Sequence, residues 1–308
     1  MQIIDLDKEN PKLNIDSITL GNFDGFHIAH QKLIEKCVNI GESAVIIFKT
    51  HTTQSLKGNN FKYILSTQDK INILSKFNVN YCLLKSFDVK FLSLTPDEFL
   101  QYLKKITNFK NLVVGKDFKF GVDATGNVEL LKSYSDIYNF KLFILNDQFI
   151  KEMPIRSTKI RELLSEGLID KANSMLYRPY SIKGKIVNGK HRGRSLGYPT
   201  ANLNCENYFI PSFGVYYTNV IYNNKLYKGI TSIGENLTYN EKEVKIETHI
   251  LDFSGNLYNQ EIILVFISKI RDNIKFDSEK ELITSLEKDY NFAKKQNLHL
   301  QLNEYMVI

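Results

Sequence analysis

The stretch 18-ITLGNFDGFHIAHQKLIEK-36 places an apolar strand before a short turn and a helix. The turn is built from glycine, asparagine and aspartate, the residue types that tolerate tight backbone bends. The helix begins with His27 and His30, which are three residues apart and therefore share one face. A strand that leads directly into a helix presents free backbone N–H groups and the positive end of the helix dipole to an anion. The stretch therefore predicts a phosphate site flanked by two imidazoles. The alternative is that one histidine caps the turn and the other lies on the surface.

Apolar β-rich runs alternate with helical periodicity over the first 150 residues. Short apolar strands separated by helices indicate a parallel sheet covered on both faces, and such sheets bind ligands at the carboxyl ends of their strands. The chain is therefore expected to begin with a Rossmann-like α/β domain. Its expected strands are 15–21, 43–48, 80–85, 111–115 and 140–145, and its expected helices are 28–40, 67–77, 95–106 and 127–138, with start signals at Thr67, Thr95 and Gly126-Asn127.

The pattern changes after Tyr180 to short strands separated by turns. Asn223-Asn224 and Ser254-Gly255-Asn256 are hairpin signals between alternating runs, which predicts a small antiparallel β-barrel. A last helix over 277–296, capped by Asp277 or Ser278, is expected to pack across the barrel. Two short helical pieces end at Arg178-Pro179, so we expect one domain over residues 1–178 and a second over 179–308.

Composition excludes several classes of protein. In 308 residues no apolar run approaches the roughly 20 residues of a membrane-spanning helix, and the N-terminal residues are acidic where a signal peptide is basic. Three cysteines without paired spacing argue against a disulfide framework or a zinc site. The net charge of +6 is spread along the chain and suits a phosphate-bearing small molecule as well as it suits nucleic acid. We therefore expect a cytoplasmic protein without a membrane segment.

Two further motifs in the first domain carry possible binding chemistry. In 113-VVGKDFKFG-121, Asp117 lies at the carboxyl end of an expected strand, where parallel sheets bind their ligands. In a later Ser-Thr-Lys-Ile-Arg run, Ser157 and Thr158 can cap a helix while Arg161 brings positive charge towards a second phosphate. A capped amphipathic helix with solvated basic residues explains that run equally well. Taken with the histidine turn, the motifs predict a nucleotide cleft.

These three motifs, in this order and spacing over most of residues 15–178, resemble the adenylyltransferase half of the bacterial bifunctional riboflavin kinase/FMN adenylyltransferase family, also called FAD synthetases. The resemblance implies an HxGH nucleotidyltransferase whose histidines, here His27 and His30, bind ATP phosphates and support attack of the FMN phosphate on the ATP α-phosphate. Ala29 stands where the family motif has glycine. The nucleotide-binding residues implied by the resemblance are Gly21, Asn22, Phe23, Asp24, Gly25, Asp117, Ser157, Thr158 and Arg161.

The loop 189-GKHRGRSLGYPTANL-203 is similar to the glycine-rich loop of the kinase half of the same family, with Tyr198 in place of phenylalanine. Its glycines let the backbone approach phosphate, and Pro199 fixes the chain so that Thr200 and Asn202 can face one hard cation. Without the resemblance, an ordinary barrel connection is the more frequent explanation of such a loop. The resemblance implies magnesium binding by Thr200 and Asn202, and ATP binding by Gly189, Lys190, Gly197 and Pro199.

Strand alternation in 244-VKIETHILDF-253 puts Glu247 and His249 on one face and isoleucines on the other. By pattern alone Glu247 is a solvated strand residue. The resemblance implies that it is the general base that takes the proton of the ribityl 5′-hydroxyl during attack on the γ-phosphate of ATP. Arg271 matches a family arginine near the flavin, and its alternative is a surface charge at the barrel rim.

The resemblance implies a six-stranded barrel that converts riboflavin to FMN and a Rossmann-like domain that converts FMN to FAD with release of pyrophosphate. It implies ATP and magnesium as requirements and riboflavin, FMN and FAD as substrates and products. We expect no nucleic-acid or membrane partner, and a monomer or weak homo-oligomer. Two alternatives remain at this level: a riboflavin kinase with a degenerate first domain, and a flavin- or nucleotide-sensing regulator. A regulator would favour a coherent basic stripe with exposed aromatic residues, and the sequence contains none.

Overall fold

The computed structural model describes residues 1–49, 61–189, 196–205, 207–236 and 241–298. The chain divides into two compact units between Ser157 and Thr158. The two short helices that follow residue 157 therefore belong to the same unit as the barrel. The domain boundary expected at residue 178 remains a prediction of where the kinase domain begins.

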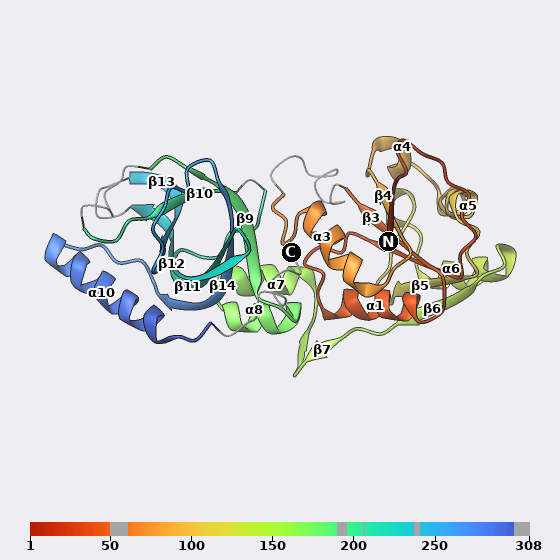
Figure 1. The fold of residues 1–308 in the computed structure, drawn as a ribbon. Helices are drawn as coiled ribbons and strands as arrows, with labels where there is room; N and C mark the ends of the chain where they lie inside the picture. The colour runs from red at the N-terminus through yellow and green to blue at the C-terminus, as the bar shows by residue number, and fades with distance from the viewer. Residues whose placement is uncertain (50–60, 190–195, 206, 237–240, 299–308) are drawn as a thin grey trace. The chain divides into compact units, whose positions relative to one another are not determined.

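The first unit contains a six-stranded, wholly parallel sheet with strand order β1-β4-β3-β2-β5-β6 (Figure 1). It confirms the five expected strands and adds β1, which the sequence pattern did not predict. Ion pairs fix the segment after β1, where the Asp7 carboxylate lies 2.6 Å from Lys85 Nζ and 2.9 Å from Lys49 Nζ. The strands are β1 (Gln2–Asp5), β2 (Ser17–Gly21), β3 (Ser43–Phe48), β4 (Tyr81–Lys85), β5 (Asn111–Gly115) and β6 (Lys141–Leu145).

The four expected helices of this unit are present, and its described residues also form three smaller elements that were not predicted. These are the short helix α4, the 3-10 helix η2 and a two-stranded hairpin, β7 with β8. The helices are α1 (Ile28–Val38), α3 (Thr67–Leu74), η1 (Ser75–Phe77), α4 (Val89–Leu92), α5 (Pro96–Ile106), η2 (Val122–Ala124) and α6 (Val128–Ile137); the hairpin strands are β7 (Phe149–Ile150) and β8 (Met153–Pro154).

Helix starts follow local capping chemistry. Thr95 and Glu98 form the reciprocal capping box that begins α5, and Asn127 accepts a hydrogen bond from the backbone of α6, as the sequence predicts. The start signal at Thr67 was wrong by one residue. Ser66 caps α3 through a capping box with Asp69, because its backbone is extended whereas that of Thr67 is already helical.

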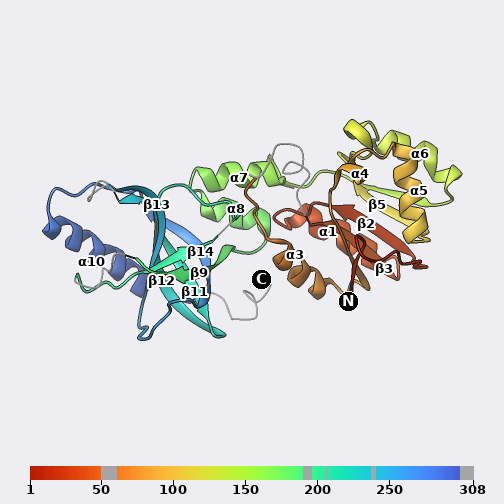
Figure 2. The ribbon, with the colours of Figure 1, turned by 90° about the horizontal axis from the view of Figure 1, so that it is seen from above.

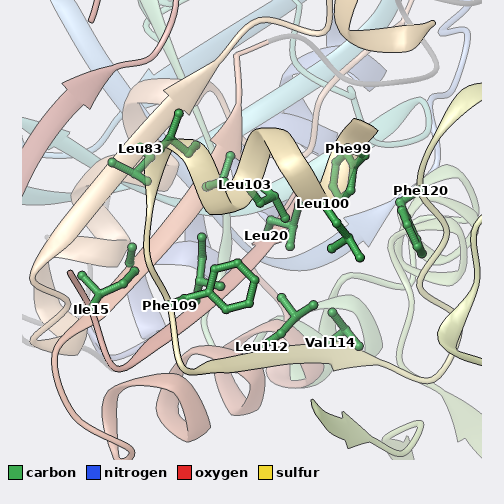
Figure 3. Packing of buried hydrophobic residues seen from close by; sticks show 14 of the residues in the cluster. Ile15, Leu20, Leu83, Phe99, Leu100, Leu103, Phe109, Leu112, Val114 and Phe120 are labelled. Carbon is green, nitrogen blue, oxygen red and sulfur yellow. The ribbon is translucent and has the colours of Figure 1, made fainter. Parts of the chain in front are cut away.

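Both faces of the sheet are buried under helices. Alternate residues of β3 point to opposite sides, so that Ile46 joins a core beneath α5 and Ile47 joins a second core beneath α1 and α3. Figure 3 shows Leu100 and Leu103 of α5 lying over the strand residues of the first core. Burying each leucine side chain contributes about 2 kcal/mol. The layered arrangement leaves the carboxyl edge of the sheet as the place for a ligand.

The second unit contains a closed antiparallel barrel with strand order β10-β13-β12-β11-β14-β9 (Figure 2). This confirms the expected six-stranded barrel. Its elements are α7 (Ser157–Ser165), which begins at the last residue of the first unit, α8 (Ile169–Leu176), β9 (Tyr180–Val187), β10 (Ala201–Asn204), β11 (Gly214–Tyr222), β12 (Lys225–Asn236), β13 (Glu241–Ile250), β14 (Glu261–Arg271) and α10 (Glu279–Lys295).

One hairpin signal in the barrel was right and one was wrong. Asn223 and Asn224 both have positive φ, 48° and 57°, and join β11 to β12 as a two-residue turn. Ser254-Gly255-Asn256 joins β13 to β14, and these two strands do not pair. Both edges of β13 are already bonded, to β10 and β12, so β14 pairs with β11 and β9 instead.

Helix α10 packs across the barrel as expected. Ser278 is its cap, since the Ser278 side chain accepts a hydrogen bond from Glu281 N, and Ala293 lies in a core cluster with Tyr217 and Ile230. Within the described ranges, no helix combines the length and the apolar character that crossing a membrane requires.

Candidate active sites

The carboxyl ends of β2 and β5 are neighbours in the sheet. Ser17 pairs with Asn111 and Thr19 with Val113, so the same register brings the ends of the two strands level. The strand order reverses here, because β3 and β4 continue on one side of β2 while β6 continues beyond β5. Open α/β sheets bind ligands at such a reversal. The structure thus brings the turn after Gly21 and the exposed Asp117 to the same place, as the sequence predicts.

The turn after β2 is held by its own side chains. Phe23 and Phe26 have positive φ, 45° and 47°, a backbone conformation that bulky residues rarely adopt. Both rings are buried in the core beneath α1, which stabilises the turn. Asp24 is only 1% exposed, and its carboxylate accepts hydrogen bonds from the backbone of Ile64 (3.0 Å) and Leu65 (3.3 Å). The Phe23 and Asp24 side chains therefore shape the turn, and their assignment to nucleotide binding remains a prediction.

The two histidines lie face to face. Their rings stack with centroids 3.6 Å apart, and the Phe23 and His30 rings form a T-shaped contact with centroids 5.3 Å apart. His27 occupies the N-cap position of α1, but its side chain makes no capping hydrogen bond. The alternative of one turn cap and one surface residue does not describe this pair.

Burial lowers the pKa of His30 well below its ordinary value of 6.5, and the charges of His27 and Lys70 lower it further. His30 is therefore neutral near pH 7 in the unliganded protein. A neutral imidazole still has one N–H to donate to a phosphate oxygen.

Lys70 is a basic residue near the histidines that sequence reasoning missed. It lies in α3, fully buried, with its ammonium 5.6 Å from the centroid of the Tyr63 ring. A mid-helix lysine is usually solvated, so its residue type alone does not indicate a binding site. The available signal was its spacing, because Lys70 precedes Ile73 and Leu74 by three and four residues and therefore shares the apolar face of α3.

Ser157 connects the Ser-Thr-Lys-Ile-Arg motif to the turn that precedes His27. Its hydroxyl donates a 2.6 Å hydrogen bond to the backbone carbonyl of Asp24. Thr158 and Arg161 lie further along α7, in the second unit. Their assignment to the ATP site remains a prediction.

In the barrel, the expected metal ligand and the expected base lie opposite each other. Asn202 of β10 pairs with Glu247 of β13, and Glu247 also pairs with Ser232 of β12. The alternation expected along β13 is confirmed, since Ile246 and Ile250 are buried while Glu247 is half-buried. The strand register therefore brings an amide and a carboxylate together without help from a loop.

Gly189 and Gly197 have different structural reasons for being glycine. A Cβ on Gly189 would lie 2.1 Å from the Asn202 amide nitrogen, so any other residue here would displace the Asn202 side chain. Gly197 has a φ of +83°, a left-handed conformation that favours glycine. Pro199 and Thr200 follow it and are exposed. Lys190 lies outside the described residues.

Arg271 is not a simple charge at the barrel rim. It lies at the end of β14, where its Nε and Nη2 donate to the Asp289 carboxylate at 3.1 and 2.7 Å. Asp289 belongs to α10 and is 3% exposed, whereas the Arg271 side chain is 20% exposed. Sequence reasoning missed Asp289, although its spacing from Leu286 and Ala293 put it on the apolar stripe of α10. The flavin-binding assignment of Arg271 remains a prediction.

Metal binding by a cluster of acidic, histidine or cysteine side chains has no support in the described part of the chain, where no group of three such residues could hold an ion. Thr200 and Asn202 instead offer a hydroxyl and an amide oxygen. Hard oxygen donors of this kind suit magnesium, which usually keeps water and phosphate oxygens as its other ligands.

Comparison with known proteins covers both units. A family model described as FAD synthetase matches residues 9–159, and one described as riboflavin kinase matches residues 176–297. The bifunctional riboflavin kinase/FMN adenylyltransferase of Buchnera aphidicola subsp. Schizaphis graminum is 34% identical over 296 residues, or 92% of this chain and 95% of the relative. The protein of that name from Haemophilus influenzae is 32% identical over 303 residues, or 96% of this chain and 98% of the relative.

A crystal structure from Streptococcus pneumoniae, described as a macrolide-efflux protein, has a similar fold over nearly the whole chain. Its TM-score is 0.86 at 29% identity, with 96% of this chain and 100% of that chain covered. The two family models match in the order of the two units, and the relatives align over nearly their full length. The chain therefore belongs to the bifunctional riboflavin kinase/FMN adenylyltransferase family.

Proposed function

We propose that this chain phosphorylates riboflavin to FMN in its barrel and adenylylates FMN to FAD in its first unit. The chain carries the domains for both activities, in the order found in its relatives. The observation that carries the proposal is the pairing of Asn202 with Glu247 across β10 and β13. Neither the monofunctional kinase nor the regulator is favoured by matches that span both units.

In the kinase reaction, Glu247 takes the proton of the ribityl 5′-hydroxyl as that oxygen attacks the γ-phosphate of ATP. Thr200 and Asn202 would hold magnesium, which supplies positive charge to the phosphate oxygens when bound. The partly exposed Glu247 and the exposed Thr200 are both accessible to substrates. The further assignments are ATP binding by Gly189, Lys190, Gly197 and Pro199, and flavin binding by Arg271.

In the adenylyl transfer, the FMN phosphate attacks the ATP α-phosphate and pyrophosphate leaves. His27 and His30 donate N–H groups to phosphate oxygens, and the start of α1 adds the positive end of its dipole. The positive charge of Lys70, which acts on His30, favours the same polyanion. Ala29, the departure from the family motif, is half-exposed in the first turn of α1. The turn residues Gly21, Asn22, Phe23, Asp24 and Gly25, together with Asp117, Ser157, Thr158 and Arg161, complete the proposed nucleotide site.

Product analysis tests the proposal directly. The purified chain is incubated with riboflavin, ATP and magnesium, and the flavins are separated by chromatography over time. We expect FMN first and then FAD. FMN without FAD, also when FMN is supplied, would mean a monofunctional kinase, and the absence of both products would overturn the proposal. Cytoplasmic location and a monomeric or weakly oligomeric state remain predictions.

A further inference from the structure

His249 makes a contact that the reaction itself does not require. It lies on β13 two residues after Glu247, and its Nδ1 is 2.8 Å from the backbone carbonyl oxygen of Pro199. A carbonyl oxygen can only accept a hydrogen bond, so Nδ1 is the donor and carries a hydrogen. A strand side chain thus holds the backbone of the loop that precedes β10.

Aromatic packing fixes the orientation of this imidazole. The Tyr198 ring meets the His249 ring edge to face at 5.6 Å, and the Tyr290 ring of α10 lies at 6.2 Å. The two tyrosine rings also contact each other at 6.1 Å. The two tyrosine rings, one from the loop and one from α10, therefore limit the ways in which the His249 ring can turn.

The segment from Pro199 to Asn202 is consequently held at both ends by β13. At one end the Pro199 carbonyl accepts from His249, and at the other Asn202 pairs in the ladder with Glu247. Thr200 lies between these two anchors and belongs to the same peptide unit as the Pro199 carbonyl. The position of its hydroxyl therefore depends on the His249 hydrogen bond.

We propose that His249 is a positioning residue for magnesium-ATP in the kinase site, acting by fixing the Pro199–Thr200 peptide. The inference rests on the proposed kinase function and on the assignment of Thr200 and Asn202 as metal ligands. In this role His249 acts through the Pro199 carbonyl that accepts its Nδ1–H hydrogen bond, and the proposal assigns it no proton transfer with the substrate. Its loss weakens binding of the metal–nucleotide complex more than it slows the chemical step.

Matched substitutions distinguish the effect of losing the hydrogen-bond donor from the effect of losing the aromatic ring. His249→Asn keeps an N–H donor at about the distance of Nδ1 from the backbone, whereas His249→Gln moves the amide one bond further out. His249→Phe keeps the ring and removes the donor. FMN formation by the full chain is measured while magnesium-ATP, free magnesium and riboflavin are each varied.

We expect His249→Phe and His249→Gln to raise the KM for magnesium-ATP and the half-saturating magnesium concentration about tenfold, the effect of one lost hydrogen bond. The kcat and the KM for riboflavin should change less than about twofold, since the substitutions alter neither the proposed base, Glu247, nor the proposed flavin-binding residue, Arg271. His249→Asn should recover most of the loss. FAD formation from added FMN should be equal in all variants, which reports an intact first unit.

Several outcomes would overturn the inference. One is an unchanged magnesium requirement in His249→Phe, and another is equal impairment of the Asn and Gln variants; either result leaves the kinase function standing if the wild-type chain makes FMN. Absence of FMN from the wild-type chain would overturn both. Should the Phe variant fail to fold, the Asn and Gln pair decides the matter alone.

Discussion

At the scale of single residues, His30 shows how burial prepares a group for an anion. Its ring is stacked on His27, makes a T-shaped contact with Phe23 and is affected by the charge of Lys70. A protonated imidazole is costly in such surroundings as long as no negative charge is near. A bound phosphate would supply that charge, and the site is therefore better suited to the liganded state than to the free one.

The depressed pKa of His30 makes the free protein sensitive to acid. The folded state keeps His30 neutral, while the unfolded state binds a proton near pH 6.5, so stability is full above that pH and falls as the pH drops below it. The measurement is the urea midpoint followed by far-UV circular dichroism at pH 7.5 and 5.5, since the chain has no tryptophan. His30→Ala should lose less stability over this interval than wild type. Equal losses would contradict the assignment.

Glu247 is expected to be essential for only one of the two reactions. Glu247→Gln keeps the shape of the side chain but removes the basic carboxylate, so FMN formation should fall at least about a hundredfold. FAD formation from added FMN should be unchanged, because the histidine turn lies in the other unit. Chromatographic product assays measure both, and parallel loss of the two activities would argue against a separate kinase site.

His30→Ala is expected to give the reverse pattern. Removing a donor that stabilises charge on phosphate in the transition state typically costs about a hundredfold in rate. FAD formation from added FMN should therefore fall by about that factor while riboflavin phosphorylation continues. The same product assays apply, and retention of wild-type FAD formation would show that the histidine pair does not serve the transfer.

At the scale of elements, much of the fold could be predicted because local chemistry and tertiary structure agree. The capping box of α5 and the Asn223-Asn224 turn are complete within a few residues of sequence. Strand β1 could not be predicted, because its four residues gain their structure from pairing with β4 about eighty positions later. The Ser254-Gly255-Asn256 signal failed for a similar reason, since strand pairing in a closed barrel depends on all six strands.

An ion pair between Arg271 of β14 and Asp289 of α10 connects this helix to the barrel. Asp289→Asn leaves the guanidinium without its buried carboxylate, which should lower the free energy of unfolding by about 3 kcal/mol. If Arg271 contacts the flavin, the KM for riboflavin should also rise several-fold. Urea unfolding and FMN formation measure the two effects.

Asp272 provides the matched control for that substitution. Its side chain is 85% exposed and pairs with Lys269, so Asp272→Asn should lower the free energy of unfolding much less than Asp289→Asn does. Equal effects of the two substitutions would show that the buried pair has no special role.

At the scale of the whole molecule, the candidate sites were only partly visible in the sequence. The glycine-rich turns and the histidine pair stand in short motifs, so their place at strand ends could be predicted. Lys70 and Asp289 were signalled only by their places on the apolar faces of α3 and α10, and their partners were not. The His249–Pro199 contact could not be identified, because it depends on the packing of segments far apart in the chain. The two units have separate cores, which is consistent with two independent reactions.

The central claim is that one chain contains two separate sites connected by FMN as a free intermediate. The most direct test mixes the Glu247→Gln and His30→Ala chains with riboflavin, ATP and magnesium and measures FAD. Neither variant alone should convert riboflavin to FAD at more than about 1% of the wild-type rate. The mixture should produce FAD, because FMN made by the His30→Ala chain is adenylylated by the Glu247→Gln chain. Failure of the mixture to make FAD, although each variant retains its own single activity, would contradict the account.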